Sequence, residues 1–151
     1  REVFNIFVGE GHAEQIKIKI GSAGAMDEKT EFPMRGRDVI TGLPKEIMIS
    51  SEHIKEALSR SVREIVDSIK MTLEVTPPEL TADIHERGIL LTGGGSLLRG
   101  LNNVISHATE IPVRIADDPL TSVVRGTGAL LEADELLAEI ILPSARNSRK
   151  R

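Results

Sequence analysis

The longest regular pattern of apolar positions lies between Ser51 and Thr76. Apolar residues recur there every three or four positions, which places them along one stripe of a helix: Ile54, Leu58, Val62, Ile65, Ile69 and Leu73. Ser50-Ser51 can cap the start of this helix, and Glu52 suits the positive end of its dipole. Pro77-Pro78 ends it, because proline cannot continue the backbone hydrogen bonding. The pattern predicts one helix of about 24 residues, roughly 36 Å long.

The sequence after this helix alternates between strand-like and helix-like segments. Gly88–Thr92 is a continuous apolar run, and a strand without a polar face is usually buried on both sides. A helix follows, whose inward positions are Leu97, Leu98, Leu101, Val104, Ile105 and Ala108. Pro112–Ala116 is expected to form a second strand, and a last helix runs from near Pro119 to about Ile141. The order strand, helix, strand, helix indicates an α/β fold.

Two features of the last helix lead to separate expectations. Asp118 precedes Pro119 and is expected to cap the helix, with Pro119 at the first helical position. Gly126 and Gly128 lie in its middle, where they weaken a helix unless another backbone or a ligand must come close.

The pattern before residue 50 is less regular. Residues 11–20 fit both a strand, through the alternation of Ile16, Ile18 and Ile20, and a helix, so the pattern alone leaves this segment ambiguous. Residues 31–38 and 45–50 form two extended segments around the turn Thr41–Pro44. These two segments predict a small β-ribbon.

Composition narrows the functional classes. The chain has no cysteine, which excludes disulfide scaffolds and thiol chemistry, and only 2% aromatic residues, which argues against base-stacking surfaces. Its net charge of −4 argues against general nucleic-acid binding. The apolar runs are far shorter than the roughly 20 residues of a membrane span. The chain begins with Arg1 and has no signal-peptide pattern, which leads us to expect a piece of a longer polypeptide.

The strongest local signal for chemistry is Gly93-Gly94-Gly95-Ser96 between a strand and a helix. Glycine lets a ligand lie against bare backbone, and a helix start offers free N–H groups, but a plain tight turn is the alternative. The segment is neither a Walker loop nor a dinucleotide fingerprint. The four histidines have no metal-ligand spacing, and Ser96 has no identifiable catalytic partners.

Several segments, in order and at matching spacing between about residues 5 and 133, are similar to the C-terminal half of MreB, the bacterial actin family of the actin/Hsp70/sugar-kinase superfamily. They are Ile6–Glu10, Ala13–Lys17, Arg35–Asp38, Thr41–Pro44, Thr76–Leu80, Asp83-Ile84, Arg87–Leu101, Asp117–Thr121 and Gly126–Gly128.

The resemblance implies an α/β, ribonuclease H-like lobe of an actin-like ATPase. Residues 1–60 would form the smaller α+β subdomain IIB, with residues 11–20 helical, and residues 61–142 the C-terminal part of subdomain IIA. The glycines at 126 and 128 would let two helices approach between lobes. Residues 143–151 are expected to form a basic, disordered tail.

The resemblance also implies which residues bind ATP. The family's adenosine lies between a helix segment, here Glu14, Gln15, Ile16 and Lys17, and a strand-loop, here Gly94, Gly95, Ser96, Leu97, Leu98 and Arg99. Glu14 would accept hydrogen bonds from ribose hydroxyls while the Lys17 stem covers the base. The family's phosphate hairpins, the residue that handles magnesium and the residue that positions water lie outside this chain. We therefore expect no ATP hydrolysis by this chain alone.

The implied function is that of a cytoplasmic ATPase at the inner face of the cell membrane. It would polymerise head to tail into filaments that organise cell-wall synthesis and maintain rod shape. Implied partners are further copies of itself, RodZ, cell-wall elongation proteins and, through upstream elements, the membrane, but no nucleic acid. The rival interpretations are a magnetosome- or plasmid-positioning filament, an Hsp70-like lobe and a binding module without a nucleotide.

Overall fold

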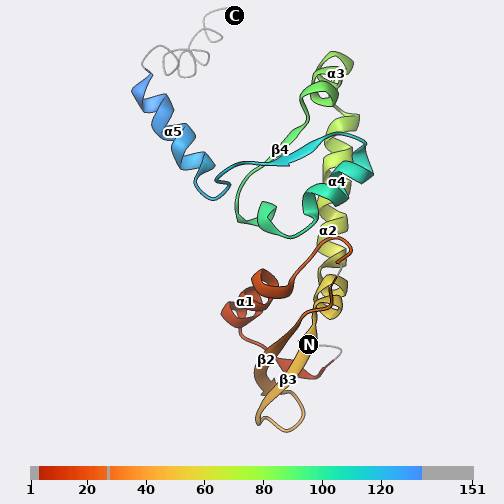
Figure 1. The fold of residues 1–151 in the computed structure, drawn as a ribbon, viewed down its shortest axis with the longest axis vertical. Helices are drawn as coiled ribbons and strands as arrows, with labels where there is room; N and C mark the ends of the chain where they lie inside the picture. Colours follow the sequence, from red (N-terminus) through yellow and green to blue (C-terminus); the bar gives the residue numbers. More distant parts are fainter. Residues whose placement is uncertain (1–3, 27, 134–151) are drawn as a thin grey trace, which may run out of the picture.

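A computed structural model describes residues 4–26 and 28–133 of the chain. Figure 1 shows α2 running along most of the length of the molecule, with the β2–β3 hairpin at one end and α3 at the other. The elements in chain order are β1 (Ile6–Phe7), α1 (Glu10–Ile20), β2 (Glu31–Asp38), β3 (Pro44–Ser50), α2 (Ser51–Glu74), α3 (Pro78–Arg87), β4 (Ile89–Leu91), the 3-10 helix η1 (Gly94–Leu97), α4 (Leu101–Thr109), β5 (Val113–Ile115) and α5 (Ser122–Glu132).

The long helix α2 forms where the apolar stripe predicts it. Ser50 and His53 make a capping box at its start, in which the Ser50 backbone N–H donates to Nδ1 of His53 over 3.2 Å. Val62 and Val66 are buried against α4, whereas Ile65, on the same predicted stripe, is 43% exposed. Ile65 therefore faces a groove on the surface rather than the core.

The N-terminal half contains a three-stranded antiparallel sheet in the order β1-β2-β3. The predicted ribbon is confirmed, with β2 and β3 paired from Glu31 opposite Ser50 to Arg37 opposite Pro44. Residues 11–20 are helical, as the family resemblance implies, and α1 buries Ile16 and Ile20 against Ile49 of β3. A helix gives this segment one buried stripe, which the sheet covers.

The C-terminal half contains two parallel strands, with Ile89 of β4 opposite Val113 of β5. The helix α4 covers one face of this sheet, where Leu91 and Val113 pack against the cluster of Val62, Val66, Leu101 and Ile105. The expectation that Gly88–Thr92 is buried on both sides is wrong for this structure, because Leu90 is 61% exposed. Successive side chains of a strand point to opposite faces, and no described element covers the second face.

The helix predicted after the glycine triplet starts later than expected. Gly94 and Gly95 form the start of the 3-10 helix η1, and Leu98–Gly100, with Gly100 at φ +73°, lie between η1 and α4, which begins at Leu101. Leu97, predicted to be inward, is 54% exposed, because it lies on η1 rather than on the buried stripe of α4. The other predicted inward positions lie at or beside the cluster.

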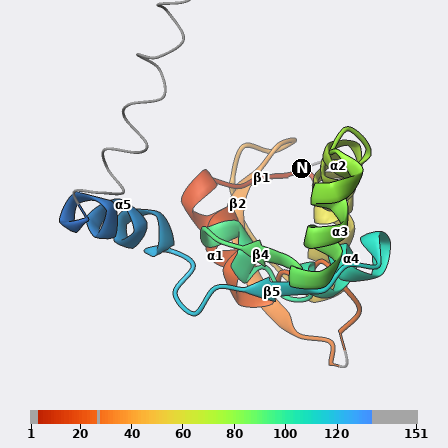
Figure 2. The ribbon, with the colours of Figure 1, turned by 90° about the horizontal axis from the view of Figure 1, so that it is seen from above.

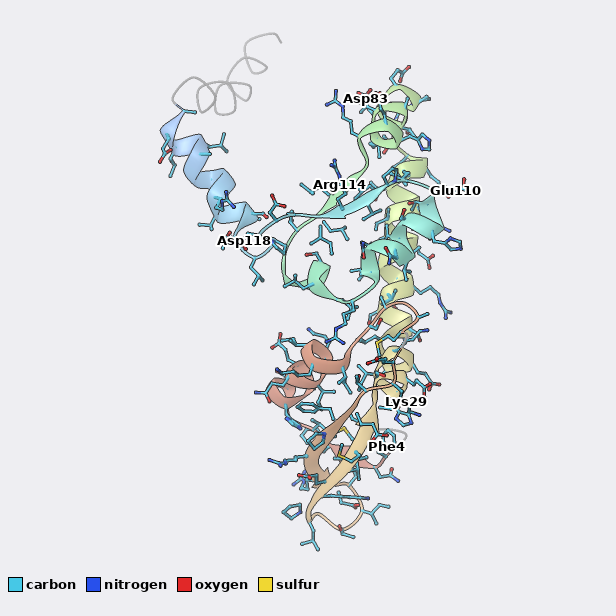
Figure 3. The ribbon with its side chains drawn as sticks, in the orientation of Figure 1. Phe4, Lys29, Asp83, Glu110, Arg114 and Asp118 are labelled. Carbon is cyan, nitrogen blue, oxygen red and sulfur yellow. The ribbon has the colours of Figure 1, made fainter. Side chains whose placement is uncertain are left out.

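The last helix also differs from its prediction at the N-terminal end. It begins at Ser122, with Thr121 as N-cap, so Pro119 lies in a turn before it. Asp118 (Figure 3) accepts a hydrogen bond from the Thr121 hydroxyl and its backbone oxygen accepts one from Ser122 Oγ, rather than capping backbone N–H groups. No described atom lies within 4 Å of a Cβ built on Gly126 or Gly128. The predicted end at Ile141 and the tail 143–151 lie outside the described residues.

Besides η1, the helix α3 and the strand β1 were not predicted from the sequence. Pro78 at the first position of α3 is a known signal of a helix start. The two residues of β1 carry no comparable signal. The predicted division near residue 60 falls inside α2, which contributes Ile54 to one hydrophobic cluster and Val62 to the other. The division stays a prediction.

Candidate functional site

The exposed face of α1 holds the first group of predicted site residues. Glu14 and Lys17 lie one turn apart, and their charged groups are 3.8 Å from each other. Gln15 is also exposed, but Ile16 is only 2% exposed because its side chain belongs to the hydrophobic core under the helix. Side chains available to a ligand on α1 are therefore those of Glu14, Gln15 and Lys17.

The second group lies on the segment Gly93–Arg99, here called the glycine loop. Gly93 has φ +80°, a conformation that side chains other than glycine rarely adopt. A Cβ built on Gly94 would lie 3.3 Å from Leu120 Cδ2, whereas one built on Gly95 has no described atom within 4 Å. Gly94 and Gly95 open the 3-10 helix, whose first N–H groups have no acceptor within the helix itself.

The remaining members of the glycine loop hold it in shape. Ser96 is buried, and its hydroxyl donates to the Gly93 carbonyl over 2.6 Å. Leu98 is half-buried beside the core cluster, while Leu97 is exposed. Ser96 is therefore a loop-stabilising residue, with its Oγ occupied by the backbone.

The two groups are brought together at Arg99. Its guanidinium Nη2 donates to the Lys19 carbonyl of α1 over 2.9 Å, and its own carbonyl accepts from the Ala23 N–H at 2.8 Å. Ser22 and Arg99 form an isolated parallel β-bridge. We call this contact of Ser22–Gly24 with Arg99–Gly100 the junction. The sequence carries no local signal for it, because its two halves are almost eighty residues apart.

Outside these two groups, Asp38, Lys29 and Glu52 have structural partners. The Lys45 ammonium, 2.8 Å from Asp38 Oδ2, and the N–H groups of Thr41 and Ile40 hold the pKa of Asp38 well below its usual range. The ion pair of Lys29 with Glu52 raises the pKa of Lys29 and lowers that of Glu52. Among the described residues, no group of three or more His, Cys, Asp or Glu side chains could hold a metal ion.

One hollow of the surface lies away from both groups. It is a groove of 710 Å³ between α2, α3 and the start of β4, and its lining is mainly apolar, with Ile65, Ile69, Leu73, Ile84 and Ile89 among its residues. None of the helices in the described part of the chain has the length and apolarity that crossing a bilayer requires.

The donor set of the two groups fits a nucleoside. A carboxylate and an ammonium lie together on α1, and the glycine loop offers bare backbone with open space at Gly95. Ribose hydroxyls are good partners for a carboxylate, and a flat base can approach a backbone that has no side chains.

The sequence matches the family described as MreB/Mbl protein over residues 1–139. The cell shape-determining protein MreB of Escherichia coli K12 is 46% identical over 132 residues, which are 87% of this chain and 38% of that protein. The chain thus spans under two fifths of the length of this relative. The crystal structure of MreB 5 of Spiroplasma citri bound to AMPPNP superposes with a TM-score of 0.85 at 37% identity, covering 92% of this chain and 42% of that one.

A second structural likeness extends to another actin-like protein. The MamK double helical filament superposes with a TM-score of 0.70 at 25% identity, covering 85% of this chain and 39% of the MamK chain. The predicted α/β, actin-like fold is confirmed by these likenesses. On the family match over most of its length and the identity to E. coli MreB, this chain belongs to the MreB/Mbl family of actin-like, cell shape-determining proteins.

Proposed function

We propose that this chain supplies one side of an adenosine-nucleotide site in a filament-forming bacterial actin that maintains cell shape. The observation that carries the proposal is the junction, through which Arg99 ties the helix bearing Glu14 and Lys17 to the glycine loop. The AMPPNP-bound state of the S. citri relative supports a nucleotide as the ligand.

The residue roles follow from the exposed chemistry. The Glu14 carboxylate accepts hydrogen bonds that the ribose hydroxyls donate, and the aliphatic part of Lys17 covers the base. Gly94 and Gly95 allow the nucleoside to lie close to the backbone. Gln15 borders the site, whereas Ile16, Ser96 and Leu98 support it from beneath. The proposed ligand is ATP, and hydrolysis of its terminal phosphoanhydride bond accompanies polymerisation. Magnesium and the phosphates would be held by residues outside this chain, so the chain alone is inactive in this proposal.

Self-association is the second part of the proposal, and the MamK double helical filament supports it. The turn between β2 and β3, residues Val39–Leu43, carries apolar side chains in water at one end of the molecule (Figure 1): Ile40 is 80% exposed and Leu43 is 64% exposed. We call it the hairpin tip. An apolar projection at one end of an elongated protomer suits head-to-tail growth.

The cellular setting belongs to the same proposal. The filament would lie in the cytoplasm at the inner face of the membrane and organise peptidoglycan synthesis with RodZ and cell-wall elongation proteins. Its membrane contacts would come from elements outside this chain.

The first experiment is sedimentation of the complete gene product with magnesium and ATP, beside the same protein without nucleotide. We expect pelleting that depends on ATP. Nucleotide binding with all protein left in the supernatant would contradict the filament assignment.

The second experiment places a side chain where the nucleoside is expected. Gly95→Val is expected to weaken ADP binding at least tenfold by steric exclusion, because a Cβ built on Gly95 meets no neighbouring segment within 4 Å and the added side chain enters the space expected for the nucleoside. Gly9→Ala, at the start of α1 and also in open space, is the matched control. Titration with a fluorescent ADP measures both, and unchanged affinity in Gly95→Val would contradict the site.

A further inference from the structure

The junction joins two segments through both side-chain and backbone contacts. The Arg99 side chain donates to the Lys19 carbonyl, one of the last four carbonyls of α1, which have no partner within the helix. On the other side, Ser22 Oγ donates to the Arg99 carbonyl over 3.1 Å. The cationic guanidinium also lies at the negative end of the α1 dipole.

The backbones at the junction are in close contact. A Cβ built on Gly100, which has φ +73°, would lie 3.2 Å from the Gly24 nitrogen. The Gly24 N–H in turn donates to Ser22 Oγ over 3.2 Å. The two backbones therefore approach closely at Gly24 and Gly100, where a side chain on Gly100 would be crowded.

Backbone hydrogen bonds connect the residues of the glycine loop to one another. Leu98 N–H donates to the Gly95 carbonyl over 3.1 Å, and Ser96 N–H donates to the Gly93 carbonyl over 3.2 Å. These bonds couple the position of Arg99 to that of Gly93–Gly95. On the α1 side, Lys17 precedes Lys19 by two residues, about 3 Å along the helix axis.

The geometry points to Arg99 as a positioning residue, with Ser22 as its partner, that fixes the distance between α1 and the glycine loop. This differs from the role that the family resemblance implies, in which Arg99 belongs to the segment that binds the nucleotide. The guanidinium reaches back to the end of α1 instead, beyond Glu14 and Lys17. The inference rests on the proposed nucleotide site and says how its two sides are held in register.

The test is a double-mutant cycle in the complete gene product, read as affinity for a fluorescent ADP. Arg99→Ala is expected to weaken binding about tenfold, the effect of losing one charge-assisted hydrogen bond. Arg99→Lys keeps one donor for the Lys19 carbonyl and is expected to restore part of the affinity. Arg114→Ala is the matched control, because Arg114 (Figure 3) also donates from Nη2 to a carbonyl, that of Arg87, outside the junction.

The decisive arm repeats Arg99→Ala in the background Glu14→Gln/Lys17→Met, where α1 no longer offers its charged contacts. A positioning residue acts through those contacts, so no further loss is expected. An equal loss in both backgrounds would show that Arg99 touches the nucleotide and would overturn the inference. Wild-type affinity in Glu14→Gln/Lys17→Met would instead reject the proposed nucleotide site.

A readout without nucleotide guards against misfolding and indirect effects. Hydrogen exchange of the amides at Ser22–Gly24 is expected to rise several-fold in Arg99→Ala and in Ser22→Ala, but not in Arg114→Ala. Ser22→Ala removes only a hydroxyl, so it provides the test if Arg99→Ala fails to fold. Unchanged exchange in Ser22→Ala, together with unchanged ADP affinity, would contradict the positioning role of the junction.

Discussion

Asp38 ends β2 and organises the hairpin tip. Its Oδ1 accepts the N–H groups of Ile40 and Thr41, both at 2.9 Å, and its Oδ2 binds the Lys45 ammonium. The carboxylate thereby holds the turn whose apolar side chains extend into water. These contacts stabilise the charged carboxylate and therefore lower the pKa of Asp38.

The low pKa predicts how acid affects stability. The unfolded chain takes up a proton on Asp38 at higher pH than the folded chain, so this group's stabilisation is complete above about pH 4 and is lost as the pH falls further. We expect Asp38→Asn to be less stable than the wild type at neutral pH, with the difference shrinking below about pH 4. Unfolding measured across that range checks this, and a constant difference would contradict it.

Ile16 shows why residue roles are hard to transfer by motif alone. The segment Glu14–Lys17 matches the family's adenosine-binding stretch in order, but the helical turn sends Ile16 into the core. Burial of a large apolar side chain contributes roughly 1.5–3 kcal/mol. The identity of Ile16 is thus fixed by packing, whereas Glu14 and Lys17 lie on the exposed face of α1.

At the scale of elements, the contact of α2 with α4 holds the C-terminal half together. Ile105 of α4 has no exposed surface and lies in the cluster with Val62, Val66 and Leu101. This cluster also supports Leu98 of the glycine loop, so its packing reaches the candidate site.

Truncation in this cluster predicts a clear loss of stability. Ile105→Ala is expected to lower the free energy of unfolding by about 2–5 kcal/mol, because it leaves a cavity that close-packed neighbours cannot fill. The control Ile18→Ala, at a position that is 64% exposed, is expected to change it by less than about 0.5 kcal/mol. Denaturant unfolding of both variants measures the two effects, and equal losses would contradict this description of the core.

Elements with strong local signals could be predicted from the sequence. The apolar stripe from Ile54 to Leu73 predicts α2, and Pro77-Pro78 predicts where it ends. The turn at Thr41–Pro44 predicts the β2–β3 hairpin. The ends of the later helices could not be predicted, because non-local contacts set them. Gly93 N–H donates to the Pro119 carbonyl over 2.7 Å and ties the loop to the turn before α5.

The candidate site was predictable only in part for the same reason. Its residues could be named from the family motifs. Gly94 and Gly95 could also be singled out because a ligand can lie against a backbone without side chains. The junction depends on the meeting of Ser22 with Arg99, which no periodicity encodes. The exposure of Leu90 likewise depends on what covers the sheet, which the apolar run itself does not specify.

At the scale of the whole molecule, several exposed apolar side chains belong to the C-terminal half. They lie on β4 and β5, on η1, in the turn before α5 and on α5, which projects away from the other helices in Figure 2: Leu90, Leu97, Ile115, Leu120, Val123, Val124 and Leu131. Exposed apolar surface of this kind is typical of an interface. In the complete gene product we expect it to be covered.

The hairpin tip gives a prediction about assembly. Ile40→Asp is expected to reduce ATP-dependent pelleting at least tenfold while ADP affinity stays within about twofold, because a charge at a desolvated contact is costly and the nucleotide site is remote. Met48→Asp, on the stem of the same hairpin and 56% exposed, is the matched control. Normal pelleting of Ile40→Asp would remove the tip from the filament contact.

The continuity of α2 has a mechanical consequence. The helix is anchored near the hairpin through Ile54 and near the glycine loop through Val62 and Val66, with no break in its hydrogen bonding between them. Over a length of roughly 36 Å, a tilt of about 5° displaces the far end by about 3 Å. If the hairpin tip contacts a neighbouring molecule as proposed, a stiff rod mounted this way acts as a lever, and pressure on the hairpin moves the opposite end of α2.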